Sequence, residues 1–315
     1  MEKNVQADTV MSERYDSIAS LPATGEEAIA RVGVVVHPSR DIDRPLGALR
    51  EWTRRHGVDL VQVPVPSQHR EVAEPGNAGE CDLLVAIGGD GTGLAAIRAA
   101  AAADRPVLGV ACGSLGVLTT VPPDGVTHAL DRFSQRDWLP RPLPALEVAR
   151  GDGAGLFALN DIAIVRAGVG QVRATARVDG ILFARLAGDG CIVSTPIGSS
   201  AYALAAGGPL IAATTDAYLF TPLPTHGGFC PPLVVGADSE LQLDTMTGHG
   251  GARLEVDGQI ADTEVGPLTI SFRRAIATVV SFADQEPSLA GLRRRRIIID
   301  SPRILAEDQP VEPRA

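Results

Sequence analysis

An apolar run that stops at a glycine-rich turn constrains this chain more than any other stretch. Residues 83–87 are all apolar, and Gly88, Gly89, Asp90, Gly91 and Thr92 follow directly. Five apolar residues in a row predict a strand buried on both faces, and the Ala-rich residues 93–103 predict a helix. The stretch is therefore expected to form a strand, a loop and a helix.

The glycine-rich turn is typical of a phosphate-binding loop. Glycines at such a joint let backbone N–H groups point at an anion, and the positive end of the next helix adds to the attraction. Phosphates repel a carboxylate there unless it binds Mg²⁺ or takes a proton from an attacking hydroxyl, so Asp90 is a candidate catalytic residue. The alternative is a plain Asp-Gly turn, since Asp-Gly recurs at positions 124, 152, 179, 189 and 257. Three glycines, Asp90 and Thr92 after a buried strand favour the phosphate loop.

Strand and helix patterns alternate on both sides of this turn. Strand patterns at 32–36, 60–63 and 107–111 alternate with helix patterns that begin at Leu46 and Val126. This alternation predicts a parallel, Rossmann-like α/β domain over residues 29–138. His37 and Pro38 stand where the dinucleotide fingerprint G-x-G-x-x-G would be, so a standard Rossmann dehydrogenase is not expected. Residues 1–28 are polar and aperiodic and are expected to form a disordered leader.

Beyond Pro140 the pattern becomes one of strands. Residues 172–178 alternate, turn at Asp179-Gly180 and resume at 181–183, which predicts a hairpin. Further strand patterns lie at 158–165, 191–194, 241–243, 253–256, 268–272 and 278–282. They predict a mainly antiparallel β domain over residues 139–285, joined to the first domain by a proline-rich, stiff linker at 138–144. Residues 286–315 are predicted to be a C-terminal segment that could return to the N-terminal domain, with a disordered tail.

Charge and composition argue against several classes of protein. The 315 residues carry a net charge of −10, whereas nucleic-acid binding needs a basic face. No signal peptide or membrane span is predicted, because the uncharged stretch 106–123 is broken by glycines and prolines. Four cysteines without Cys-x-x-Cys spacing predict buried, reduced thiols and a cytoplasmic protein.

Four further clusters of polar residues stand out from the strand and helix patterns. Asn160-Asp161 interrupts an apolar strand, so this pair faces a ligand or finds buried partners. Residues 194–200 carry four hydroxyls, more than one helix cap requires. The loop at 224–228 contains a lone histidine, His226, for which a structural role is favoured. The turn Asp257-Gly258-Gln259 is by itself a hairpin turn.

Together and in this order, these stretches resemble the NAD kinase family, within the wider group of kinases that share Gly-Gly-Asp-Gly-Thr with diacylglycerol and sphingosine kinases. The resemblance covers residues 32–282, and Thr-Pro-x-Gly-Ser-x-Ala-Tyr at 195–202, followed by Gly-Gly-Pro at 207–209, is its most specific part. It implies transfer of a phosphoryl group from ATP, or polyphosphate, to the 2′-hydroxyl of the adenosine ribose of NAD, with Mg²⁺. It also implies a homodimer or homotetramer in which the β domain contributes to a neighbour's site.

The resemblance assigns roles to individual residues. Asp90 would be the general base that receives the 2′-hydroxyl proton, and no residue is assigned to the metal. The residues implied to bind NAD are Asp90, Gly91, Asn160, Asp161, Asp189, Ser200, Ala201, Tyr202 and Gln259. The residues implied to bind the phosphates of ATP are Gly88, Gly89, Thr92, Thr195, Gly198 and Ser199.

The chain departs from the family at a few positions. Asp161 replaces the usual Glu, Ala111 the usual Asn and Ile197 the usual Thr. Ala95 replaces a basic residue, for which Arg98 could substitute one helical turn later, and Arg185 could likewise serve for the basic residue often found at Ala187. Two alternatives stay open: a kinase of the same group that acts on a lipid or another alcohol, and a non-catalytic regulator that binds NAD or NADP.

Overall fold

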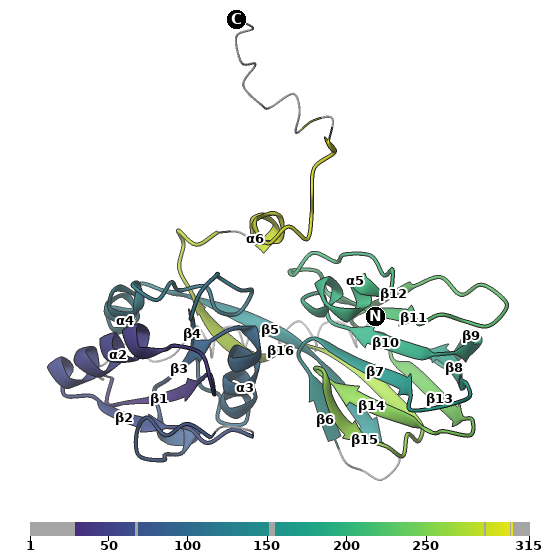
Figure 1. Ribbon diagram of the computed structural model, residues 1–315, viewed down its shortest axis with the longest axis horizontal. Helices are drawn as coiled ribbons and strands as arrows, with labels where there is room; N and C mark the ends of the chain where they lie inside the picture. Colours follow the sequence, from purple (N-terminus) through teal and green to yellow (C-terminus); the bar gives the residue numbers. More distant parts are fainter. Residues whose placement is uncertain (1–28, 67–68, 151–154, 287, 303, 305–315) are drawn as a thin grey trace, which may run out of the picture. The chain divides into compact units, whose positions relative to one another are not determined.

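The computed structural model describes residues 29–66, 69–150, 155–286, 288–302 and 304 (Figure 1). They form two compact units, of which the first holds the residues up to Arg141 together with Ala277–Gln285. The second holds Pro142–Ile276 and the described residues from Glu286 onward. The predicted leader, 1–28, and residues 305–315 of the predicted C-terminal segment lie outside the described residues. No helix in the described part of the chain is long and apolar enough to cross a membrane.

The first unit is built on a parallel sheet of apolar strands. Its order is β2 (Asp59–Gln62), β1 (Arg31–Val36), β3 (Leu83–Gly88) and β4 (Val107–Ala111). Every residue of β3 and β4 is buried, as expected for central strands covered on both faces. The end of β16 (Leu268–Ser281) adds to this sheet, where Val279 pairs in parallel with Val107. The predicted α/β domain is confirmed.

Helices cover both faces of this sheet (Figure 1). On one face α2 (Asp43–His56) and α4 (Val126–Ser134) share a core with the strands, in which Trp52 and Leu130 are fully buried. The indole N–H of Trp52 donates to Asp131, 2.6 Å away. On the other face, α3 (Asp90–Ala101) packs mainly on β3. A short 3₁₀ turn, η1 (Ala78–Glu80), precedes β3.

The second unit is a sandwich of two sheets. One is antiparallel throughout, in the order β12 (Leu233–Gly236), β11 (Ala217–Pro222), β10 (Gly190–Ser194), β7 (Asp161–Arg166), β14 (Ala252–Val256) and β15 (Gln259–Asp262). The other continues from β16 through β13 (Leu241–Thr247), β8 (Val172–Val178) and β9 (Ile181–Gly188). In this sheet β5 (Leu139–Arg150) also pairs with β16, and β6 (Gly155–Ala158) pairs with β5. The predicted, mainly antiparallel β domain is confirmed.

One apolar core fills the space between these sheets. Ile164, Tyr218 and Leu241 are buried in it. The outer face of the first sheet carries α5 (Tyr202–Ala205), whose Ala203 packs with Ile192 and Leu219, preceded by the 3₁₀ turn η2 (Gly198–Ser200). The helix α6 (Ser288–Arg294) follows β16. This outer layer holds the hydroxyl-rich segment in place.

The units differ from the predicted boundaries at two long strands. Residues 138–144, predicted as a linker, mostly form the start of β5, which tolerates prolines because the first residues of a strand need not donate N–H groups. The patterns at 268–272 and 278–282 belong to the single strand β16, so Ala277–Gln285 groups with the first unit. Arg273 and Arg274 interrupt its apolar pattern, and exposed ion pairs with Glu147 and Asp216 satisfy their charges. The described residues of the C-terminal segment group with the second unit and do not return to the first.

Candidate functional site

The glycine turn after β3 is shorter than predicted. The N–H groups of Thr92 and Gly93 both donate to the Gly89 carbonyl at 3.0 Å, so α3 begins at Asp90 and not at position 93. Gly88 leaves room for Thr92, because a Cβ at Gly88 would lie 2.2 Å from Thr92 Oγ1. Asp90 and Gly91 therefore belong to the first helical turn, where the helix dipole favours a negative charge.

The Asp90 carboxylate is held by the backbone of the loop that follows β4. Its Oδ2 accepts the Val117 N–H at 3.0 Å, and its Oδ1 accepts the Leu118 N–H at 2.9 Å. The N–H and hydroxyl of Thr119 lie 3.3 and 3.4 Å from Oδ1. Hydrogen bonds of this kind fix the orientation of a carboxylate. Asp90 is half-buried and presented as an oriented acceptor.

Two glycines let this loop close onto the carboxylate. A Cβ at Gly116 would lie 2.0 Å from Asp90 Oδ1, and a Cβ at Gly109 of β4 would lie 1.9 Å from the Leu118 carbonyl oxygen. Neither distance is compatible with a side chain, so both positions require glycine for close approach. Residues 109–119 thus form the wall behind Asp90.

An arginine that the sequence analysis missed lies against the glycine turn. A Cβ at Gly89 would lie 3.4 Å from Nη1 of Arg40, which is exposed in the loop between β1 and α2. Nδ1 of His37 accepts the N–H groups of Ser39 and Arg40 at 3.2 and 3.1 Å and so shapes this loop. Burial, and then the charge of Arg40, lowers the pKa of His37. Arg40 lies 50 residues before Asp90 in the chain, so no local sequence pattern links it to the turn.

In the second unit, Asp257 ties down the Asn160-Asp161 pair. Its carboxylate accepts the N–H groups of Leu159, Asn160 and Asp161 at 3.1, 2.7 and 3.1 Å. In return, the Asp257 N–H donates to the Asp161 carbonyl at 2.9 Å. The hairpin turn that appeared plain from the sequence thus positions the residues predicted to bind ribose and adenine.

Asp161 is a buried acid beside two others. Its side chain is only 6% exposed. Burial, followed by repulsion from Asp257 and Glu255, raises the pKa of Asp161 to about 7. A strongly perturbed carboxyl is typical of functional sites, although structural acids also show such shifts.

The hydroxyl-rich segment is held largely by its own hydrogen bonds. The fully buried Thr195 hydroxyl donates to the Leu159 carbonyl at 2.7 Å, and that of Ser199 donates to the Pro196 carbonyl at 2.6 Å. A Cβ at Gly198 would lie 1.9 Å from the Asn160 carbonyl oxygen. These contacts position the Asn160 segment, and the phosphate-binding role expected for Thr195, Gly198 and Ser199 stays a prediction. The Ser200 hydroxyl donates to the Ile197 carbonyl at 3.0 Å.

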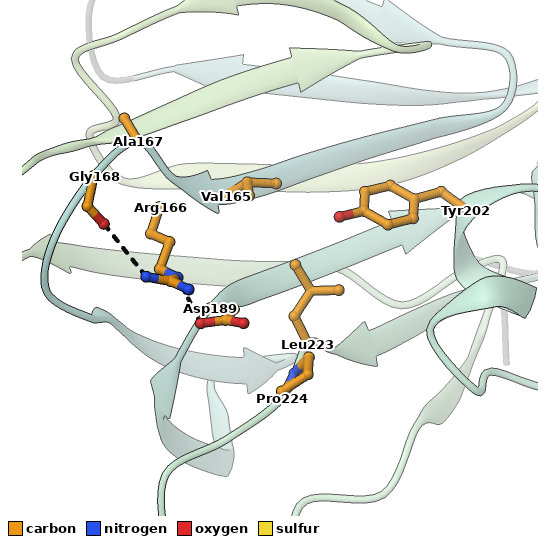
Figure 2. Close-up of a pocket in the computed structure, with 8 residues that line it drawn as sticks. All are labelled: Val165, Arg166, Ala167, Gly168, Asp189, Tyr202, Leu223 and Pro224. Atoms are coloured by element: carbon orange, nitrogen blue, oxygen red, sulfur yellow. Dashed lines mark hydrogen bonds and ion pairs between the residues drawn. The ribbon is translucent and has the colours of Figure 1, made fainter.

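Asp189 and Tyr202 line one open cavity of about 420 Å³ in the second unit (Figure 2). Figure 2 shows the Tyr202 ring directed toward Val165 and the neighbouring pair of Arg166 and Asp189. Arg166 Nε lies 2.6 Å from Asp189 Oδ1, an ion pair that the sequence analysis did not foresee. The structure therefore brings together two of the residues implied to bind NAD.

The other predicted residues occupy exposed or peripheral positions in their units. Gln259 is exposed and pairs with Val256 across the Asp257-Gly258 turn. Ala201 is exposed just before α5, and Arg185 is exposed on β9. The His226 N–H donates to the Ala187 carbonyl at 2.8 Å, while its side chain is exposed. All four cysteines are free, with Cys81 and Cys191 buried and Cys112 and Cys230 half-buried.

Comparison with known protein families decides the assignment. The family model of the ATP-NAD kinase N-terminal domain matches residues 16–138, and that of the C-terminal domain matches residues 159–271. The chain belongs to the NAD kinase family. NAD kinase 1 of Streptomyces avermitilis is 32% identical over 274 residues, covering 74% of this chain and 77% of that protein. The predicted NAD kinase function and enzyme class are confirmed, and no comparison supports a lipid kinase.

Two solved structures share the fold of NAD kinases with this chain. Yeast NADH kinase complexed with NADH aligns with a TM-score of 0.71 at 20% identity, covering 87% of this chain and 89% of that chain. An NAD kinase from Archaeoglobus fulgidus in complex with ATP aligns with a TM-score of 0.66 at 24% identity, covering 85% and 100%. At these identities the likeness concerns the fold, and the predicted fold class is confirmed.

Proposed function

We propose that Asp90 takes the proton from the 2′-hydroxyl of the adenosine ribose of NAD while that oxygen receives a phosphoryl group from ATP. The observation that carries the proposal is the Asp90 carboxylate itself, held by three consecutive backbone N–H groups of residues 117–119. Asp90 is half-buried, so part of its side chain stays accessible to the substrate hydroxyl. Because the carboxylate is already oriented, little free energy is needed to align it with the substrate hydroxyl in the transition state.

The donor phosphates would lie on the glycine turn. Gly88, Gly89 and Thr92 are at the start of the 12-residue helix α3, where unpaired N–H groups and the helix dipole attract anions. Arg40, beside Gly89, would supply a positive charge to this turn in a chain whose net charge is −10. It is thus a better placed cation than the Arg98 expected from the sequence, which lies in the last turn of α3.

Mg²⁺ would arrive with the nucleotide. The described residues contain no cluster of three His, Cys, Asp or Glu side chains that could hold a metal ion. In kinases Mg²⁺ is bound mainly by substrate phosphates and water, so it does not require such a cluster. When bound, Mg²⁺ neutralises charge on the transferring phosphoryl group.

NAD as the acceptor would be bound by residues of the second unit. Asn160 and Asp161 would contact the ribose and the adenine side, because Asp257 holds their backbone from behind. Asp189, Ser200, Ala201 and Tyr202 would contact the nicotinamide half, and the cavity shared by Asp189 and Tyr202 supports this part of the proposal. Gln259 would complete the pocket.

One assay tests this function. The purified chain with Mg²⁺, ATP and NAD should form NADP, detected with an NADP-specific dehydrogenase. Parallel reactions with polyphosphate as donor and NADH as acceptor define the substrates. Tight binding of NAD or NADP without any product would contradict the proposal and support the non-catalytic regulator.

We also propose a homodimer or homotetramer in the cytoplasm. Large apolar side chains of the second unit are exposed, among them Val169 at 85%, Phe229 at 90% and Met246 at 68%, and association would cover such groups. Light scattering coupled to size-exclusion chromatography measures the number of subunits. A monomer at assay concentration would contradict this part.

A further inference from the structure

Arg141 lies in the segment 138–144 that was predicted to be a linker. It contacts the loop whose N–H groups hold the Asp90 carboxylate. It is the third residue of β5 and belongs to the first unit, as Asp90 does. Its Nη2 donates to the Val117 carbonyl at 3.0 Å, and its Nε is buried without a hydrogen-bond partner in the described structure. Burial lowers the pKa of Arg141, and the negative charge of Asp90 opposes that shift. The guanidinium is therefore close enough to Asp90 for their charges to interact.

A single peptide group links the two side chains. The carbonyl of the Val117–Leu118 peptide accepts from Arg141, and the N–H of the same peptide donates to Asp90 Oδ1 at 2.9 Å. Because a trans peptide directs its carbonyl and N–H to opposite sides, the group is held from both ends. A charged donor on the carbonyl polarises the peptide, which strengthens the hydrogen bond from its N–H.

We propose that Arg141 is a positioning residue for phosphoryl transfer, which acts through the Val117–Leu118 peptide to hold the Asp90 carboxylate in its reactive orientation. This inference rests on the proposed role of Asp90 as the general base. Arg141 touches neither reacting atom in this scheme, so its loss should impair turnover and leave the binding of both substrates nearly unchanged. Displacement of a reactive group by about 1 Å can lower a rate on the order of 100-fold.

The chain offers a matched control for the packing contribution of a half-buried arginine. Arg105 in the first unit also donates from Nη2 to a backbone carbonyl, that of Gly79 at 2.9 Å. Its Nε is likewise buried without a hydrogen-bond partner in the described structure. Since the carbonyl that it contacts belongs to η1 and not to the loop that holds Asp90, Arg105→Met reproduces the loss of packing and of one hydrogen bond to a carbonyl without touching that loop.

The experiment compares steady-state kinetics of wild type, Arg141→Met, Arg141→Lys and Arg105→Met with NAD and ATP. We expect Arg141→Met to lower kcat about 10- to 100-fold with both KM values within about threefold. Arg141→Lys, which keeps the charge and one donor, should recover a large part of the lost kcat. Arg105→Met should keep kcat within about twofold of wild type. Melting temperatures of all four proteins verify that they are folded. If Arg141→Met does not fold, the kcat values of Arg141→Lys, which keeps the positive charge, and Arg141→Gln, which removes it, are compared instead.

Hydrogen exchange of the Leu118 amide tests whether Arg141 holds the Val117–Leu118 peptide against Asp90. This measurement does not depend on enzyme activity. This proton should exchange at least about tenfold faster in Arg141→Met than in wild type, because its hydrogen bond to Asp90 is weakened. Unchanged exchange, an unchanged kcat, or equal losses in the Arg141 and Arg105 variants would overturn the inference. If wild type forms no NADP but the exchange is still faster in Arg141→Met, the proposed function is wrong. The structural role of Arg141, which holds the Val117–Leu118 peptide against Asp90, is then still supported.

Discussion

Gly116 and Asp90 approach so closely that no side chain fits between them, since a Cβ at Gly116 would lie 2.0 Å from Asp90 Oδ1. The loop that supplies N–H groups to the carboxylate is therefore pressed directly against it. This contact connects the geometry of residues 116–119 to the reactivity of Asp90.

Gly116→Ala should lower kcat about 10- to 100-fold, because the loop must move away and its N–H groups lose their alignment with Asp90. The measurement is the rate of NADP formation at saturating NAD and ATP, together with the melting temperature. Gly113→Ala is the control, since a Cβ at Gly113 would have no atom within 4 Å. Equal kcat values for the two variants would show that the close approach has no catalytic consequence.

Asp90→Asn should lower kcat by about 10² to 10⁴ through loss of a positioned base. The amide has nearly the same shape as the carboxylate, so circular dichroism should show an unchanged fold. The melting temperature should fall, because the amide NH₂ cannot accept a backbone N–H as the carboxylate oxygens do. Undiminished NADP formation would exclude Asp90 as the general base.

Arg40→Met should raise the KM for ATP about tenfold and leave the KM for NAD unchanged, because one charge beside the phosphate turn is lost. Arg44→Met is a suitable control, as Arg44 is 74% exposed and pairs with Asp124 at 3.7 Å. A larger effect on NAD than on ATP would place Arg40 at the acceptor and not at the donor.

Asp161 should make the protein less stable as pH rises from about 4 to about 7. Burial raises its pKa from 3.8 to about 7, so in this window the folded state holds a proton that the unfolded state has lost. Asp161 contributes most to the free energy of unfolding below the pKa that it has in the unfolded state. This contribution falls as pH rises toward the pKa that it has in the folded state. In urea titrations at several pH values, the difference in unfolding free energy between Asp161→Asn and wild type should therefore grow with pH, by on the order of 2–4 kcal/mol. A constant difference would contradict the raised pKa.

The sequence predicted the parts of the fold that depend on local pattern. The buried run of β3, the Ala-rich helix α3 and the hairpin of β8 and β9 all follow from apolar periodicity and turn residues. The prolines at 140, 142 and 144 were misleading, because a strand whose first residues carry prolines has the same local composition as a linker. The patterns at 268–272 and 278–282 belong to one strand, because Arg273 and Arg274 interrupt the apolar pattern of β16 without ending it.

By itself, the sequence determined that a glycine turn between a buried strand and a helix carries Asp90, since glycine content and periodicity act over a few residues. Only the tertiary structure decided which groups surround that carboxylate. Val117, Leu118 and Thr119 lie 27 to 29 residues further along the chain, and Arg141 contacts the same loop from another strand. Such partners are set by the packing of the sheet, the pairing of β3 with β4 and the space left by Gly109 and Gly116, none of which leaves a periodic signal in the chain.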